Sequence, residues 1–205
     1  MDFVSIDHIL PDPTILCVKL AAMHRDSVSP RNSQFGLPVV SCHGPFRQPV
    51  DWDESWANLF ARLLNRLFDF ETSLHGPWNE QCQGDFNRLI DHTIPRLLGA
   101  LQSNGRVIKP CLVHGNLSAS TMALNMDNEE PILLGPRILY AHNEYELGGW
   151  CRKTGTLPWS FFREYQKQYP PSEPVEEWDD RLKLYSIKFN LEHAIDRRSP
   201  NTQRQ

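Results

Sequence analysis

The chain lacks the sequence features of a zinc-binding, disulfide-rich or membrane-spanning protein. Its five cysteines are widely spaced and none forms a Cys-x-x-Cys pair, so we expect neither a metal site nor a disulfide framework, and a reducing cytoplasm is the expected location. No apolar run approaches the ~20 residues of a membrane span. The opening stretch, MDFVSIDHILPDP, has no basic region and no long apolar core, so we expect no signal peptide.

The chain also lacks the excess of positive charge that favours nucleic-acid binding. It has 21 lysines and arginines against 25 aspartates and glutamates, a formal net charge of −4, so no nucleic-acid partner is expected. Hydrophobic residues make up 40% of the 205 residues, which is enough for one folded domain with a core.

Most of the chain has the hydrophobic spacing of helices. The pattern predicts helices at about 14–25, 51–74, 83–103, 143–150, 158–168 and 175–196. In the first helix we expect Ile15, Val18 and Ala22 to share one face. Asp51 and Glu54 form a capping-box pattern at the start of the second helix.

Three shorter features interrupt the helices. Pro95 should kink or split the third helix, because proline lacks the amide hydrogen that a helix interior uses. Residues 26–50 are rich in proline and glycine, which indicates an irregular segment. Residues 111–113 form a short apolar run that predicts a buried strand, and 122–134 contain two apolar runs around an acidic turn, which predicts a hairpin. The predicted fold is therefore mainly α with a small β-hairpin.

Residues 111–121, CLVHGNLSAST, have the form of a strand that leads into a functional loop. An apolar triplet runs into His-Gly and then into small polar residues. However, the loop contains no carboxylate and no lysine, and its one thiol belongs to the strand. The pattern therefore indicates a catalytic type of loop without an evident catalyst.

The order of elements, with a His-Gly loop before a hairpin, resembles the C-terminal lobe of the protein-kinase-like (aminoglycoside phosphotransferase-like) fold. More narrowly, it is similar to the fructosamine kinase family in its fungal form, also called ketosamine or protein-ribulosamine 3-kinases. The similarity covers about residues 16–193. It rests on five stretches in the same order: KLAAMHRDSVSP with FGLPVVSCHG, WDESWANLFARLL, HTIPRLLGALQSNGRVIKPCLVHG, YAHNEYELG, and EEWDDRLKLYSIKFNLEHA.

The resemblance implies an ATP- and Mg²⁺-dependent phosphotransferase whose substrate is a glycated protein or a small ketosamine. Phosphoryl transfer depends mainly on positioning and on charge neutralisation. In this family the loop is approximately His-Gly-Asp-Leu-Trp-x-Gly-Asn. Its Asp is the base that accepts the proton of the sugar hydroxyl, and its final Asn is a metal ligand. A second metal ligand is an Asp just after the hairpin.

This chain departs from the family pattern at each of these chemical positions. The base position is Asn116, and a neutral amide does not serve as a general base. The two metal positions are Thr121 and Gly135, so no metal site is expected. The tryptophan and glycine positions of the loop are Ser118 and Ser120. We therefore expect no cofactor in this chain.

The resemblance also implies that an N-terminal ATP-binding lobe is missing. Family members carry about a hundred residues before the stretch that begins here near Leu16, and a segment of that length has the size of a domain. The first glycine is Gly36, and Lys19 is the only lysine before Lys109, so no glycine-rich loop and no lysine-bearing strand precede the lobe. The expected division is a short extension at 1–15, a kinase-like C-lobe at 16–196 and a polar tail at 197–205.

Several residues around the loop have two possible roles. His114 is either an orienter of the catalytic loop or a buried histidine that holds the loop's shape. Asn116 either positions a hydroxyl weakly or uses its amide in turn bonds. His142 and Glu144 lie beside the active cleft in the resemblance and are candidate substrate contacts. The alternative is that an acid in this stretch, Glu144 or Glu146, caps the helix or bonds to the loop.

Three functions are consistent with the sequence. The first is a truncated, catalytically inactive member of the family, a pseudokinase. The second is a working kinase that transfers phosphate from ATP to the 3-hydroxyl of a ketosamine. The third is a non-enzymatic binding module, in which the lobe surface left uncovered recruits a protein partner or a second copy of the chain.

Overall fold

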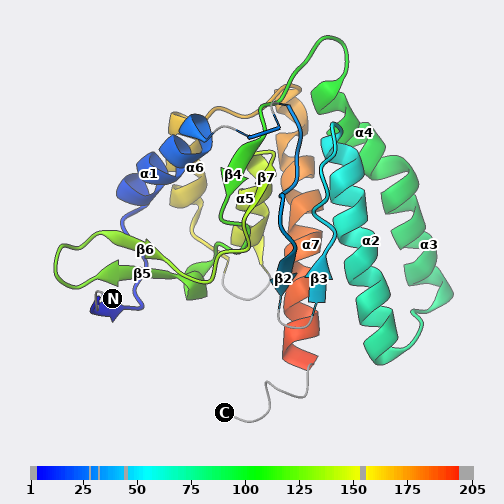
Figure 1. Ribbon diagram of the computed structural model, residues 1–205, viewed down its shortest axis with the longest axis horizontal. Helices are drawn as coiled ribbons and strands as arrows, with labels where there is room; N and C mark the ends of the chain where they lie inside the picture. The colour runs from blue at the N-terminus through cyan, green and yellow to red at the C-terminus, as the bar shows by residue number, and fades with distance from the viewer. Residues whose placement is uncertain (1–3, 28, 32, 44–45, 153–155, 199–205) are drawn as a thin grey trace.

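The computed structural model describes residues 4–27, 29–31, 33–43, 46–152 and 156–198, and it is mainly helical (Figure 1). The α-helices are α1 Pro13–Asp26, α2 Trp56–His75, α3 Glu80–Arg88, α4 Ile94–Gly99, α5 Glu144–Gly148, α6 Trp159–Gln168 and α7 Trp178–Arg198. The strands are β1 Ile6–Asp7, β2 Ser41–His43, β3 Phe46–Gln48, β4 Cys111–Val113, β5 Met122–Asn125, β6 Pro131–Leu133 and β7 Leu139–Ala141. None of the helices in the described ranges is long and apolar enough to cross a membrane.

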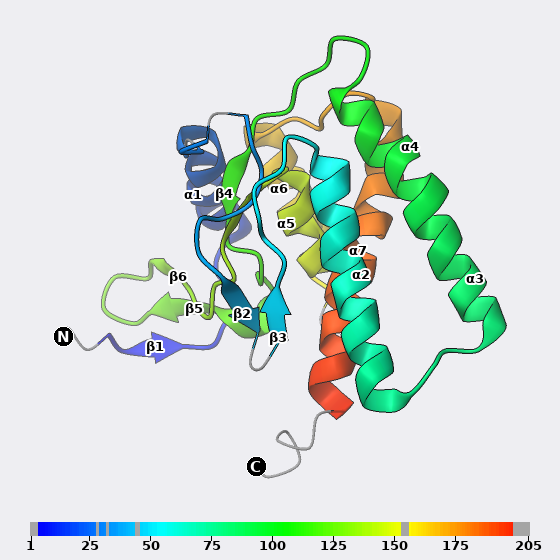
Figure 2. The same ribbon diagram turned by 45° about the vertical axis from the view of Figure 1, so that its right-hand side comes forward.

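Helix α7 runs through the middle of the molecule. Helices α2, α3 and α4 lie on one side of it, and α1, α6 and the strands β4 and β7 lie on the other (Figures 1 and 2). Helices α2 and α5 pack against α7, and α1 packs against α6. The predicted tail at 197–205 begins within α7, which extends to Arg198, and residues 199–205 lie outside the described part.

The strands form three small antiparallel sheets, with the order β1-β5-β6 in one and the pairs β2-β3 and β4-β7 in the others. The predicted hairpin at 122–134 is confirmed as β5 and β6. The segment 26–50, expected to be irregular, contains the short hairpin β2–β3. Strand β1 lies within the predicted extension 1–15 and pairs with β5.

The N-cap of helix α2 lies four residues after Asp51, the expected capping residue, so the predicted capping box is wrong. Ser55 is the N-cap, and its side chain accepts the amide hydrogen of Asn58. The preceding residues are extended because Asp53 forms a β-bridge with Phe35. Serine and aspartate are about equally good N-cap residues. The local pattern therefore could not distinguish Ser55 from Asp51.

Helix α1 buries a different face from the one predicted. Ile15 and Val18 are 47% and 42% exposed, whereas the buried residues are Leu16, Cys17, Leu20, Ala21 and His24. The helix packs against α6, where His24 Nδ1 lies 2.7 Å from the hydroxyl oxygen of Tyr165. Because the buried face includes a histidine, hydrophobic spacing alone did not identify it.

The third predicted helix is divided, as expected from Pro95. Helix α3 continues into a π-helical turn at Leu89–Thr93, and α4 then begins with Pro95 in its first turn. The wider π-helical turn just before Pro95 is where the regular α-helical hydrogen bonds are interrupted, which accommodates the missing proline amide.

Two hydrophobic clusters meet at the loop that follows β4. One cluster surrounds Trp56 and Tyr185, whose side chains share a hydrogen bond of 2.8 Å, and it includes Val113 at the end of β4. The other surrounds Trp150 and includes Leu117 from the loop itself. The loop at 114–121 is therefore held between two packed units.

Candidate active site

Glu146 of α5 anchors the loop. Its side chain is 0% exposed, and its carboxylate accepts the backbone amides of His114 and Gly115, with Gly115 N 3.1 Å from Oε1. His24 Nε2 lies 3.8 Å from the same carboxylate. This confirms the expectation that an acid of this stretch bonds to the loop.

The surroundings of Glu146 favour its ionised form. Burial raises the pKa of the carboxyl, but the hydrogen bond and charge of His24, the charge of His114 and the amide of Gly115 together hold the pKa below its usual value. A buried anion is stable here because several donors converge on it.

Gly115 allows the loop to approach the segment after the hairpin. Its φ is +72°, and a Cβ at this position would lie 2.2 Å from the carbonyl oxygen of Arg137. The amide of Arg137 in turn donates to the carbonyl of His114 at 2.7 Å. Only glycine fits both the backbone angle and the close contact, so residues 135–137 are fixed against the loop.

The three positions implied by the family resemblance lie together. Asn116 Nδ2 donates to the carbonyl of Gly135 at 2.9 Å, and a Cβ at position 135 would lie 3.7 Å from that nitrogen. The Thr121 hydroxyl donates to the carbonyl of Asn116 at 2.7 Å and accepts the amide of Ser118 at 2.9 Å. Positions 116, 121 and 135 therefore form one site.

Both ends of the Asn116 amide are occupied. Its Nδ2 bonds to Gly135, and its Oδ1 accepts a hydrogen bond of 3.0 Å from Arg152 NH2. The side chain has no proton-accepting lone pair of useful basicity. A guanidinium beside Oδ1 makes proton transfer to it still less favourable.

The donors present at this site do not fit Mg²⁺, which prefers carboxylate and carbonyl oxygens. The Thr121 hydroxyl is used in bonds within the loop, and Gly135 has no side chain. The positive charge of Arg152 lies where a cation would approach Asn116. Within the described ranges, no group of three or more His, Cys, Asp or Glu side chains is placed to hold a metal ion.

His114 lies buried under the loop, with 5% of its surface exposed. Its Nδ1 accepts the amide of Asn116 at 3.3 Å. Burial lowers the pKa of His114, although the charge of Glu146 opposes that change. A neutral ring that accepts a backbone hydrogen bond stabilises the shape of the loop, and the role of His114 as a catalytic orienter stays a prediction.

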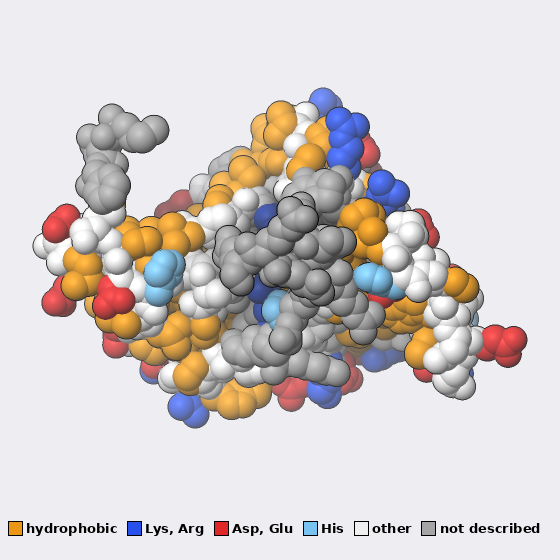
Figure 3. All heavy atoms as spheres, turned by 90° about the horizontal axis from the view of Figure 1, so that it is seen from below, with side chains coloured by type: hydrophobic (Ala, Val, Ile, Leu, Met, Phe, Trp, Pro, Cys, Tyr) orange, Lys and Arg blue, Asp and Glu red, His pale blue; other side chains and the backbone are white. Residues whose placement is uncertain are grey.

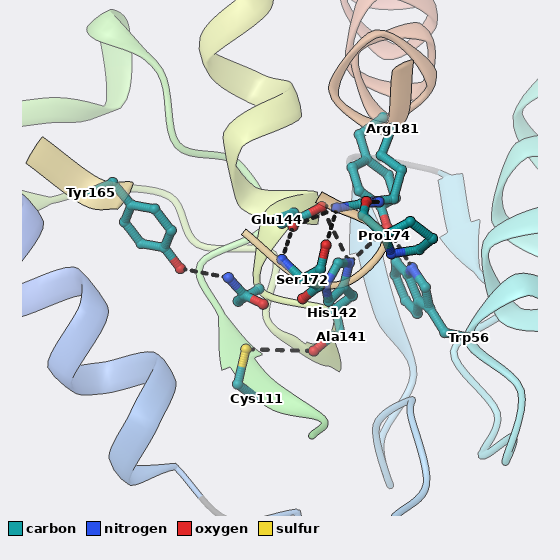
Figure 4. Close-up of polar contacts among 11 residues, drawn as sticks. Trp56, Cys111, Ala141, His142, Glu144, Tyr165, Ser172, Pro174 and Arg181 are labelled. Carbon is teal, nitrogen blue, oxygen red and sulfur yellow. Dashed lines mark hydrogen bonds and ion pairs between the residues drawn. The ribbon is translucent and has the colours of Figure 1, made fainter. Parts of the chain in front are cut away.

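His142 and Glu144 lie in a buried polar network behind the loop (Figure 4). The two ring nitrogens of His142 lie 2.8 Å from the Tyr185 hydroxyl and 2.9 Å from Ser172 Oγ. Glu144 forms a two-point ion pair with Arg181, at 2.7 and 3.0 Å. Both residues are almost fully buried, at 1% and 2% exposure. Their predicted role as substrate contacts stays a prediction.

Sequence reasoning missed a set of charged residues, of which Arg152 contacts Asn116. On α7, Lys188 Nζ lies 2.8 Å from Glu192 Oε1, and both side chains are at most 1% exposed. Arg137 NH1 lies 3.4 Å from Glu192 Oε2. The sequence does contain a signal for this ion pair, since Lys188 lies four residues before Glu192 on the inward face of a helix. Arg152 gave no such signal, because its contact with Asn116 joins residues 36 positions apart.

Comparison with known proteins relates residues 1–196 to the family model described as fructosamine kinase. The chain is 29% identical over 195 residues to a chloroplastic protein-ribulosamine 3-kinase of Oryza sativa subsp. indica, covering 94% of this chain and 52% of that protein. It is 31% identical over 166 residues to a ketosamine-3-kinase of Mus musculus, covering 78% and 48% respectively. The chain therefore spans about half the length of these curated relatives.

Solved structures show the same fold. A putative fructosamine-3-kinase from Haemophilus somnus 129PT superposes with a TM-score of 0.71 at 19% identity, covering 93% of this chain and 59% of that one. One from Thermobifida fusca YX-ER1 gives a TM-score of 0.67 at 21% identity, covering 94% and 62%.

The buried carboxylate of Glu146 should contribute strongly to stability. We expect Glu146→Gln to lower the free energy of unfolding by about 2–3 kcal/mol, because charge-assisted hydrogen bonds to buried amides are lost. Urea unfolding followed by circular dichroism measures this change. Glu164→Gln is the matched control, since the Glu164 carboxylate is paired with the exposed Lys167, and it should cost less than about 1 kcal/mol. Equal losses in the two variants would show that Glu146 is not the anchor.

Stability should fall as the pH drops below 6.5. Burial lowers the pKa of His142 from 6.5 to about 4, so between these values the unfolded chain binds a proton that the folded chain does not. The free energy of unfolding should then decrease by up to about 1.4 kcal/mol per pH unit through this group. Thermal unfolding at pH 7, 6 and 5 measures the slope.

Two variants separate His142 from the other titrating groups. His142→Gln should reduce the slope, whereas His75→Gln, at the exposed end of α2, should leave it unchanged. A His142→Gln variant with the full wild-type slope would exclude His142 as the cause.

Proposed function

Because this chain belongs to the fructosamine kinase family, we propose that it is a pseudokinase, a catalytically inactive member that retains the phosphotransferase loop without its chemistry. The observation that carries the proposal is the residue at the base position. Asn116 is a neutral amide whose two polar atoms are bonded to Arg152 and Gly135. It therefore offers neither the charge nor the free lone pair that proton transfer from a sugar hydroxyl needs.

The metal positions support the same proposal. In a working kinase of this type, Mg²⁺ would neutralise the charge that develops on the transferred phosphate. Thr121 and Gly135 offer no carboxylate, and Arg152 places a positive charge beside the site. We therefore propose that the site uses no Mg²⁺ and transfers no phosphate from ATP.

The proposal also concerns which part of the kinase fold these residues form. The chain covers 52% of the rice relative and 59% of the Haemophilus structure, and its elements are mainly helical. We propose that residues 16–196 form the C-terminal lobe of that fold. The five cysteines are free thiols, which supports the proposed cytoplasmic location.

An activity assay tests the proposal directly. The protein is incubated with MgATP and either a ribulosamine-modified protein or a small ketosamine, because the names of the relatives point to these substrates. A coupled assay measures ADP release. We expect no release above the rate of Asn116→Ala, since neither residue is a base.

One result of this assay would contradict the pseudokinase proposal. ADP release that depends on the ketosamine and disappears in Asn116→Ala would establish a working ketosamine kinase and overturn the proposal. Asn116→Asp with Gly135→Asp is the matched gain-of-function variant. It restores both carboxylates. A Cβ at position 135 would lie 3.7 Å from Asn116 Nδ2, but the φ of +58° strains any side chain there, so circular dichroism must first show that the variant is folded.

A second candidate function is a binding module that uses an uncovered apolar surface. Six large hydrophobic residues near the start of the chain are 37–49% exposed, namely Val4, Ile6, Ile9, Leu10, Ile15 and Val18. Figure 3 shows hydrophobic side chains gathered on the side of the molecule that carries β1, β5 and β6. Several exposed apolar side chains in one stretch favour contact with a partner or a second copy.

Sedimentation velocity tests the binding module. We expect the sedimentation coefficient to rise between about 1 and 100 μM through self-association, because burying this surface is favourable by roughly 25 cal/mol per Å². Ile15→Asp with Val18→Asp should abolish the rise, whereas the matched pair Val39→Asp and Val40→Asp, on another exposed segment, should not. A single monomeric species throughout would contradict self-association through this surface.

A further inference from the structure

A groove lies between α3 and α7, and we call it the α3–α7 groove. It holds a cavity of about 340 Å³, lined by Asp85 and by six apolar side chains, namely Trp78, Cys82, Phe86, Leu89, Ile187 and Leu191. Helix α3 and strand β4 lie on opposite sides of α7 (Figures 1 and 2). The groove is therefore separate from the loop that follows β4, and none of its lining residues belongs to the candidate active site.

The groove exists because α3 diverges from α7. Helix α4 packs against α7, whereas α3, on the other side of the π-helical turn Leu89–Thr93, leads away from α7 in both views (Figures 1 and 2). Phe86 is the one buried residue of α3. Cys82 lies one turn before Phe86 on the same face of the helix but is only half-buried, so this end of α3 leaves a space beside α7.

Aromatic rings line the groove, and contacts with α2 hold them in place. The rings of Phe86 and Phe68 stack with their centroids 4.0 Å apart, and the ring of Trp78 lies 4.7 Å from that of Phe68. The indole N–H of Trp78 donates to Glu71 of α2, which is not among the residues that line the groove. Trp78 and Phe86 therefore offer preformed aromatic surface, which favours contact with another ring.

The lining supplies no positive charge. Among the described residues that line the cavity there is no lysine, arginine or histidine. Hydrogen bonds from Gln81 and Arg88 lower the pKa of Asp85, which is already ion-paired with Arg88. An anion in the groove would have no partner, which is costly in an apolar site, and a cation would gain little from a carboxylate that is paired and exposed. The groove is therefore suited to an uncharged ligand.

The size of the cavity limits the size of the ligand. An apolar cavity of roughly 150 Å³ accommodates one benzene, so a cavity of about 340 Å³ accommodates two fused rings. A second cavity of about 310 Å³ adjoins it, because Leu89 and Ile187 line both. Its charged members Arg96 and Lys183 are ion-paired with acidic side chains. Thr93 also belongs to that lining and can exchange a hydrogen bond with a hydroxyl group.

We propose that the α3–α7 groove binds an uncharged aromatic molecule of two fused rings that carries a hydroxyl group. The groove is open to solvent, since Ile187 is 39% exposed and Trp78 and Cys82 are partly exposed, so the ligand enters without unfolding of the chain. Removal of the rings and of this apolar wall from water favours binding. The inference goes beyond the proposed function and does not depend on it.

Calorimetric titration tests the proposal. The full chain is titrated with 2-naphthol, which is uncharged at pH 7, and with 2-naphthalenesulfonate, which has the same rings and a negative charge. We expect saturable binding of 2-naphthol. The sulfonate should bind at least about tenfold more weakly, because the apolar cavity has no cation to pair with it.

Alkylation of Cys82 reports where the ligand binds. Cys82 is a free thiol in the wall of the groove, and Cys42, on β2, is an exposed free thiol outside it. With 2-naphthol at about ten times its Kd, about one groove in eleven is empty, so iodoacetamide should modify Cys82 about tenfold more slowly. Mass spectrometry of the peptides measures both rates, and the rate at Cys42 should not change.

Matched variants locate the site independently. Ile187→Asp places a charge in the apolar wall and should weaken 2-naphthol binding by about tenfold or more. Val175→Asp is the control, since Val175 is a similarly exposed apolar residue just before α7 and outside the lining. If circular dichroism shows that Ile187→Asp is unfolded, Cys82→Trp replaces it, because the added ring would fill the groove. Its control is then Asn87→Trp, at an exposed position of α3.

Four results would overturn the aromatic site. They are the absence of saturable 2-naphthol binding, equal binding of the sulfonate, equal losses in a groove variant and its control, and an unchanged rate at Cys82. Slower alkylation of Cys82 at higher protein concentration without ligand would instead identify a second copy of the chain as the occupant. None of these results changes the outcome of the ADP assay, so the two proposals can fail separately.

Discussion

A buried carboxylate, Glu146, holds together the part of the molecule that contains the candidate active site. It accepts the amides of His114 and Gly115 and lies close to His24 of α1. The loop after β4 therefore keeps one shape although it has no regular hydrogen-bonding pattern of its own. Because a buried anion without partners is very costly, removal of any of these donors should disturb the loop, the start of α5 and the packing of α1 together.

Helix α5 is short, but it joins the two hydrophobic clusters. Glu144 points to Arg181 on α7, whereas Glu146, two residues later, points to the loop and α1. His142 bonds to the Tyr185 hydroxyl, which also accepts the indole hydrogen of Trp56 (Figure 4). Buried polar groups that are fully paired favour one arrangement of the core over others. This explains how the family fold is held in one arrangement around the loop.

The side chains at the three family positions differ in charge from those that the resemblance implies. A phosphotransferase site holds a cation between carboxylates and phosphate, whereas in this chain Arg152 lies next to the neutral amide of Asn116. The backbone geometry is compatible with either set of side chains, since positions 116, 121 and 135 still lie together.

The sequence by itself determined the main helices, the hairpin β5–β6 and the neutral amide at position 116, because these depend on local periodicity or on residue identity alone. Only the tertiary structure decided which acid bonds to the loop, since Glu144 and Glu146 are equivalent by pattern and differ in what faces them. The same holds for the buried face of α1, which is set by Tyr165 of α6. Likewise, Arg152 reaches Asn116 across 36 positions, and no local pattern encodes a contact of that separation.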